Sequence, residues 1–162
     1  MGEGPQDRLQ HLQRTGRPHW LRNPPSAGAW HAGRRCLVIT DGFYEWRKAD
    51  KQPFAIERPG ALTVMAGLWE VWTSPAGERI TSCTIITTDA NEVVAPLHDR
   101  MPVILKPGDW PAWLGEVEAD DAALKALFVP YDGPLKVFPV SKRVGNVRNN
   151  DVSLVKPSEA TR

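Results

Sequence analysis

The stretch TDGFYEW, residues 40–46, follows directly on the apolar run at residues 36–39. The apolar run is typical of a buried strand, and the Asp-Gly pair marks a bend before a second strand at residues 43–47. Glu45 stands between two aromatic residues, where neither a surface loop nor a core strand normally has a carboxylate. A second corner of this kind, PLHDRMPVIL at residues 96–105, again sets charged residues beside an apolar run. The two corners call for a common explanation.

The pattern outward from this stretch predicts an α+β domain. Apolar or alternating runs predict short strands at 35–39, 43–47, 53–57, 61–66, 80–87, 103–105 and 135–141. Helical patterns predict short helices at 91–95, capped by Asp89, and at 109–114 and 119–128. Such an element list favours a curved mixed β-sheet or open barrel with a few short helices.

Length and charge set broad limits on the protein. The 162 residues fit one domain with its own core, and the formal net charge is only +1. Residues 134–150 carry basic side chains without an acid, whereas acids gather between residues 109 and 132. This asymmetry fits either a basic face for a polyanion or ordinary solvated surface. Residues 1–33 are rich in Gly, Pro and Arg and are expected to be poorly organised, apart from a short helix near 7–14.

The cysteines and the hydropathy exclude several classes of function. Cys36 and Cys83 lie in apolar runs at a spacing that matches no metal or redox motif, so we expect buried thiols in a reducing cytosol and neither a metal nor another cofactor. No apolar run approaches membrane length, and no signal peptide opens the chain. The sequence therefore predicts a soluble intracellular protein.

The charged residues of the two corners each admit two interpretations. A carboxylate between aromatics is partly desolvated, which raises its pKa and suits Glu45 to acid–base work, but Glu45 could equally form an ion pair with Arg47 or Arg35. His98 can shuttle protons near neutral pH or serve as a hydrogen-bonded structural residue. Arg100 can clamp a phosphate or pair with its neighbour Asp99.

Tryptophan is abundant, and several of these rings offer stacking area for unpaired bases or simply build the core. The candidates are Trp46, Trp69, Trp72, Trp110 and Trp113. The helical spacing of the last two favours packing.

Four blocks of the sequence closely resemble the SOS response-associated peptidase (SRAP) family. In order they are RRCLVITDGFYEWRK (34–48), AGLWEVW (66–72), TIITTDANEVVAPLHDRMPVIL (84–105) and FPVSKRVGNVRNNDVSLVKP (138–157). The resemblance spans residues 34–157, leaving 1–33 as a non-matching segment and 158–162 as a tail.

The resemblance implies a specific function. Members of the family recognise abasic sites in single-stranded DNA and link to them covalently, which shields the lesion in the SOS and DNA damage response. By position, Glu45 corresponds to the catalytic glutamate and His98 to the catalytic histidine. Arg100 resembles a DNA-backbone contact, and Trp46 and Met101 would lie near the lesion.

The resemblance fails at the N-terminus. Family members begin Met-Cys-Gly-Arg, and that cysteine supplies both the thiol and the α-amine of the covalent link, whereas this chain begins Met1-Gly2. Neither Cys36 nor Cys83 has a free α-amine, and the family's asparagine segment has no match. We therefore expect an incomplete domain: a truncated gene, a degenerate paralogue, or one half of a split protein completed by a partner chain. Exposed sheet edges would then give marginal stability.

Three functional hypotheses remain from the sequence. The first is an enzyme of abasic-site processing, in which the amine of Gly2 or Met1 forms a Schiff base and gives lyase activity. The second is a non-catalytic single-stranded DNA binder that uses Trp46, Arg100, Arg143 and Arg148 and binds with salt-sensitive affinity. Under either hypothesis we expect a cytoplasmic, nucleoid-associated protein that is monomeric unless a partner chain completes it. A peptidase acting in trans, as the family name suggests, is the least favoured.

Overall fold

The computed structural model describes residues 24–158. Its elements, in chain order, are α2 (Pro24–His31), β1 (Arg35–Thr40), β2 (Gly42–Trp46), β3 (Pro53–Glu57), β4 (Thr63–Thr73), β5 (Arg79–Ile85), β6 (Thr87–Asp89), β7 (Arg100–Pro102), η2 (Pro107–Asp109), α3 (Trp110–Leu114), α4 (Asp121–Ala126), β8 (Lys136–Pro139), η3 (Lys142–Gly145) and η4 (Val152–Val155). The α+β class with a few short helices is confirmed.

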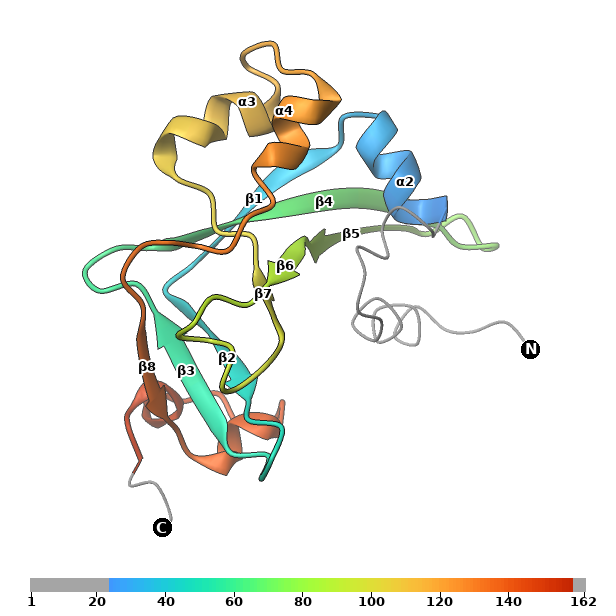
Figure 1. The fold of residues 1–162 in the computed structure, drawn as a ribbon. Helices are drawn as coiled ribbons and strands as arrows, with labels where there is room; N and C mark the ends of the chain where they lie inside the picture. The colour runs from blue at the N-terminus through green and yellow to red at the C-terminus, as the bar shows by residue number, and fades with distance from the viewer. Residues whose placement is uncertain (1–23, 159–162) are drawn as a thin grey trace.

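The strands of the described chain pair antiparallel throughout, in three small sheets. The orders are β1-β4-β5, β2-β3-β8 and β6-β7. Within residues 24–158 the strands do not close into a barrel. Figure 1 shows the first sheet under the helices, the second at the other end of the molecule, and β6-β7 between them.

The bend at Asp41 moves the chain from the first sheet to the second. The Thr40 hydroxyl donates to the carbonyl of Gly42 at 2.7 Å, which tightens the bend. A Cβ on Gly42 would lie 2.8 Å from the carbonyl oxygen of Ile56, so the approach of β3 to β2 requires glycine there. The opening stretch therefore joins the two sheets.

The helices cover one face of the first sheet (Figure 1). The rings of Trp30 and Trp113, from α2 and α3, pack at 6.1 Å between centroids, and Phe128 meets both at 5.9 Å. The indole of Trp113 also donates to the carbonyl of Cys36 at 2.9 Å, which ties α3 to β1. Leu68 of β4 is 2% exposed beneath this layer.

The second sheet packs on both of its faces. One face, with Phe43, Phe54 and Ile56, forms a core with the segment at residues 90–104. The other face packs Tyr44 against Val144 of η3. The two sides of β2 therefore meet different parts of the chain.

Several predicted elements differ from the structure. The predicted helix at 91–95 is wrong, because residues 92–97 form hydrogen-bonded turns. Asp89 belongs to β6, and the cap is Asn91, whose side chain accepts from the N–H of Val94 at 3.0 Å. The strand predicted at 103–105 contributes only an isolated bridge at Ile104, after β7.

The structure describes only part of the N-terminal segment for which the sequence made predictions. Residues 24–31, inside the segment expected to be poorly organised, form α2. The helix expected near residues 7–14 lies outside the described residues.

Candidate functional site at Glu45 and His98

Glu45 lies near the end of β2 and faces aromatic rings. In the antiparallel register it stands opposite Phe54 of β3. Because successive side chains of a strand point to opposite faces, Glu45 shares its face with Phe43, whereas Trp46 points to the other side. Both phenylalanine rings pack against the core formed with residues 90–104. The half-buried carboxylate therefore lies at the edge of an apolar cluster.

Burial raises the pKa of the Glu45 carboxyl above its ordinary value. Weaker influences act on the same pKa: His98, the N–H of Trp46 and Lys48 lower it, and Asp99 raises it. The N–H of Trp46 reaches Glu45 Oε1 at 3.3 Å. Charges from β2, its following turn and the loop at 90–99 thus act on one carboxyl, which brings the two corners of the sequence together.

The imidazole of His98 is oriented by the backbone around it. The N–H of His98 donates to the carbonyl of Val94 at 3.1 Å, and the N–H of Arg100 donates to His98 Nδ1 at 3.0 Å. Nδ1 also lies 3.3 Å from the carbonyl oxygen of Arg100 and 3.2 Å from Asp99 Oδ1, so the tautomer of the ring decides whether Nδ1 donates or accepts. Within residues 24–158 no hydrogen bond engages Nε2, which leaves this nitrogen to contact a ligand.

Lys48 and Asp99 connect the two segments of the site. The N–H of Lys48 donates to the carbonyl of Leu97 at 3.3 Å. Its ammonium lies 3.0 Å from Asp99 Oδ2, and Asp99 Oδ1 lies 3.2 Å from His98 Nδ1. Sequence reasoning did not single out Lys48 or treat Asp99 as more than a partner for Arg100, although both adjoin the motif residues in WRK and HDR.

The ion pairs considered for Glu45 are not formed. Arg47 binds Asp50, with Nε 2.9 Å from Oδ1, and its guanidinium lies 5.1 Å from the centroid of the Phe54 ring. Arg35 donates to the carbonyl of Trp113. The interpretation of Glu45 as the partner of Arg47 or Arg35 is therefore wrong for this structure.

Arg100 is half-buried and Met101 is buried at the base of the loop. Arg100 pairs with Asp89 at 3.1 Å and donates to the hydroxyl of Thr87 at 3.0 Å, so it joins β7 to β6 instead of pairing with Asp99. Met101 is 1% exposed, and its sulfur accepts the N–H of Asn91 at 3.3 Å. Met101 contributes to the core in this structure.

Trp46 and the C-terminal basic residues lie on the outer side of β2. Trp46 is 38% exposed. Since Val144 of η3 packs on the same face, through Tyr44, the segment carrying Arg143 and Arg148 borders this side. Arg143 pairs with Asp151 at 2.8 Å, whereas Arg148 is exposed and makes no ion pair within the described residues.

Neither cysteine takes part in this site, and the described residues form no metal site. Both cysteines belong to strands, but the expectation of two buried thiols is wrong, because Cys83 is exposed and Cys36 is half-buried. Burial, and more weakly Cys83, raises the pKa of the Cys36 thiol. Among residues 24–158 no cluster of three or more His, Cys, Asp or Glu side chains is arranged to ligate a metal. No helix in that range combines the length and apolar character needed to cross a bilayer.

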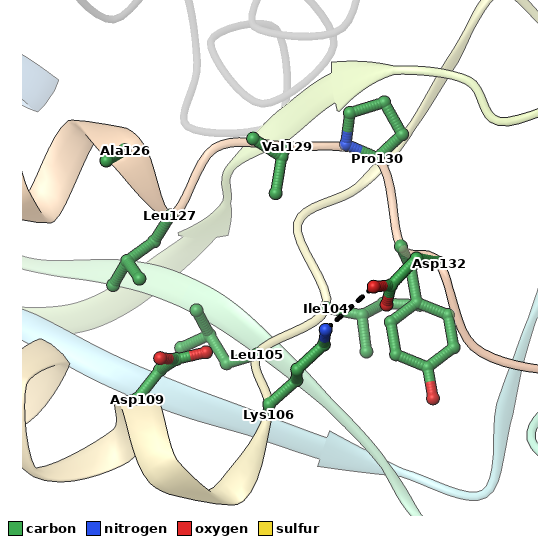
Figure 2. Close-up of a pocket in the computed structure, with 10 residues that line it drawn as sticks. Ile104, Leu105, Lys106, Asp109, Ala126, Leu127, Val129, Pro130 and Asp132 are labelled. Atoms are coloured by element: carbon green, nitrogen blue, oxygen red, sulfur yellow. Dashed lines mark hydrogen bonds and ion pairs between the residues drawn. The ribbon is translucent and has the colours of Figure 1, made fainter.

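A separate cavity of about 230 Å³ lies between the loop after β7 and the segment after α4. Figure 2 shows Lys106 and Asp132 joined across it, with Nζ and Oδ2 at 2.8 Å. Leu127 and Val129 line its other side. None of the predicted site residues lines this cavity.

Comparison with protein-family models identifies the chain. The model described as SOS response associated peptidase matches residues 18–147. The chain belongs to the SRAP family. Within this family, the abasic site processing protein YoqW of Bacillus subtilis is 37% identical over 144 residues, which cover 86% of this chain and 64% of YoqW. The abasic site processing protein HMCES of Xenopus tropicalis is 40% identical over 143 residues, covering 73% of this chain and 42% of HMCES.

Two solved structures share the fold of this chain. A crystal structure from Bacteroides thetaiotaomicron superposes with a TM-score of 0.76 at 26% identity, covering 86% of this chain and 63% of that protein. One from Bordetella bronchiseptica gives 0.69 at 25% identity, with 86% and 72% covered. The chain thus spans less than two thirds of the length of YoqW and HMCES.

Proposed function

We propose that this SRAP-family chain recognises abasic sites in single-stranded DNA and that Glu45 and His98 are the acid–base pair of their covalent processing. The observation that carries the proposal is a half-buried carboxyl at the edge of an apolar cluster, on a strand whose following turn is bound through Lys48 to the loop that carries His98. The names of YoqW and HMCES, both abasic site processing proteins, support it. The cellular setting proposed with it is the DNA damage response at the cytoplasmic nucleoid.

The chemistry of an abasic site suits this pair. Abasic deoxyribose exchanges between a closed hemiacetal and an open aldehyde, and each direction moves one proton onto oxygen and another off it. Nε2–H of His98 can donate to the ring oxygen. The Glu45 carboxylate can accept the hydroxyl proton, and its raised pKa improves it as a base. Dehydration of a carbinolamine by an attacking amine needs the same donor and acceptor.

The DNA contacts of the proposal lie on the outer side of β2. Trp46, on the face of β2 opposite Glu45, offers an exposed ring on which a base next to the abasic site can stack, and Arg148 and Arg143 offer charge for phosphates. Arg100 can bind a phosphate if the phosphate replaces its present partner, the exposed carboxylate of Asp89. Met101 is assigned to packing.

The test is a comparison of affinities at one salt concentration. Fluorescence anisotropy is measured with single-stranded oligonucleotides of one sequence, either intact or carrying a central tetrahydrofuran analogue of the abasic site. The proposal predicts tighter binding to the abasic strand and loss of that preference in Trp46→Ala. Equal affinity for both strands would refute abasic-site recognition.

A second function, non-catalytic binding of single-stranded DNA, is favoured by the exposed Trp46 and Arg148 alone. It predicts that Arg148→Ala weakens binding and lowers the salt slope by about 0.7, since each phosphate contact on a single strand releases counterions. Arg79→Ala on β5, in the other sheet, is the matched control and should change neither. Glu45→Gln separates the two functions: it should abolish covalent processing, including any lyase step, and leave simple binding intact.

The proposal includes three further points. The first is the hydrolase and protease activity suggested by the family name, and the second is a monomeric state. The third is completion of the site by another segment or a partner chain.

A further inference from the structure

Lys48 brings an amine to the acid–base pair. It stands in the turn after β2, three positions beyond Glu45, and its N–H is bound to the carbonyl of Leu97 in the opposing loop. Its ammonium lies 3.0 Å from Asp99, whose other oxygen lies 3.2 Å from the His98 ring. Lys48, Asp99 and His98 all act on the charge of Glu45.

The ion pair between Lys48 and Asp99 does not confine the lysine to a structural role. Their side chains are 57% and 69% exposed, and an ion pair in water of this kind contributes little to stability. Asp99 already contacts His98 through its other oxygen, so the carboxylate keeps a partner when the lysine leaves it. The exposed amine is thus free to move from Asp99 to a substrate.

The other described lysines with acidic partners are engaged elsewhere. Lys106, Lys125 and Lys136 pair with Asp132, Asp121 and Glu57. Lys51 shares the turn with Lys48 but forms no ion pair among residues 24–158. Lys51 is therefore a natural control for Lys48.

We propose that the ε-amine of Lys48 forms an imine with the ring-opened aldehyde of an abasic site held at Glu45 and His98. This inference rests on the proposed function and extends it to a nucleophile within the described residues. Lysine amines form Schiff bases with carbonyl substrates when a neighbouring group removes the ammonium proton.

The steps balance as an addition followed by a dehydration. The Glu45 carboxylate takes a proton from the ammonium, the free amine bonds to the aldehyde carbon, and Glu45 gives that proton to the carbonyl oxygen, which also accepts a hydrogen bond from Nε2–H of His98. Glu45 then takes one of the two protons on the adduct nitrogen, which gives a neutral carbinolamine with a lone pair. The hydroxyl leaves as water with the proton held by Glu45, and the lone pair forms the C=N bond. Ammonium and aldehyde thus give a protonated imine and water, with no change of oxidation state.

The experiment traps the imine. The full chain is incubated with a single-stranded oligonucleotide containing one abasic site and sodium cyanoborohydride, which reduces an imine to a stable amine. A denaturing gel measures the adduct, and mass spectrometry of the proteolytic digest locates it. The expected result is an adduct on Lys48 that is lost in Lys48→Gln and retained in Lys51→Gln.

A second variant separates the amine from the ion pair. Lys48→Arg keeps a cation for Asp99 but has a guanidinium that cannot form the imine, so the adduct should be lost while affinity for the tetrahydrofuran strand is kept. An adduct that maps to another amine, or persists in Lys48→Arg, would overturn the inference. Absence of any adduct with selective binding intact overturns it as well and leaves abasic-site recognition standing, whereas absence of selective binding overturns the proposed function itself.

Discussion

Glu45 lies near the end of a strand, at the edge of an apolar cluster, and its carboxyl is influenced by the charge of His98. Its burial disfavours the ionised form, so the folded protein binds this proton more tightly than the unfolded chain does. A raised folded-state pKa gives a stability contribution that is complete below the ordinary value of 4.5 and is lost as pH rises through the folded-state pKa. The ionised carboxylate therefore costs stability at neutral pH.

Replacing Glu45 by Gln removes that cost while keeping the shape of the side chain. We expect Glu45→Gln to raise the Tm at neutral pH, with the gain disappearing as pH falls below 4.5. Differential scanning calorimetry across this range measures it, with Glu92→Gln on the exposed part of the loop as control. A loss of Tm at neutral pH would mean that the ionised carboxylate stabilises the fold.

At the residue scale, the pairing of Glu45 with His98 as acid and base stays a prediction, and the electrostatic effect of His98 on Glu45 is consistent with it. The resemblance supplied both residues, and the aromatic flanks of Glu45 indicated desolvation. The partners of the charged residues could not be predicted, because Arg47 with Asp50 and Lys48 with Asp99 depend on how a turn and a loop approach in space.

At the scale of elements, β4 is the central strand of the first sheet, and the thiol of Cys36 packs closely against its backbone. A Cβ on Gly67 would lie 2.8 Å from Cys36 Sγ, 3.0 Å from Val38 Cγ2 and 3.3 Å from the carbonyl oxygen of Thr84. Glycine is thus required at Gly67 by close packing of β1 and β5 around it.

Adding a methyl group at Gly67 should strain the sheet. We expect Gly67→Ala to lower the free energy of unfolding by about 1–3 kcal/mol, the usual cost of overpacking. Gly108→Ala, whose added Cβ meets nothing within 4 Å, should change it by less than about 0.5 kcal/mol. Urea denaturation compares them, and an unchanged stability in Gly67→Ala would contradict the packing described for β1 and β4.

The local pattern of apolar residues predicted the strands whose own residues determine which side is buried. β1, β2 and β3 were predicted to within two residues at each end, since their apolar or alternating runs are continuous. β4 runs on to Thr73, beyond the predicted end at 66, because pairing with β5 continues where Trp69 and Trp72 are partly exposed. β6 and β7 have three residues each and are strands only because they pair with each other, so no local sequence signal predicts them.

At the scale of the molecule, the first sheet is packed on one face and partly exposed on the other. Ile86, beneath the helices, is 3% exposed, whereas its neighbour Ile85 is 39% exposed. Ile85 and Ile86 are adjacent isoleucines on opposite faces, so substituting each in turn probes one face of the sheet at a time.

The paired substitutions test this layer arrangement. Ile86→Ala should cost about 2–5 kcal/mol, as core isoleucine truncations do, and Ile85→Ala less than about half of that. Chemical denaturation of both variants gives the comparison. Equal costs would mean that the face bearing Ile85 is covered in solution. The marginal stability expected from the sequence stays a prediction, and a sharp thermal transition at high temperature would refute it.

The account depends on the Glu45 carboxyl and the His98 imidazole acting on each other. The most direct measurement is a titration of the Glu45 carboxyl carbon by ¹³C NMR in the wild type and in His98→Gln. Since His98 lowers the pKa of Glu45, its removal should raise that pKa further. An unchanged or lower pKa of Glu45 in His98→Gln would contradict the coupled pair on which the proposed function rests.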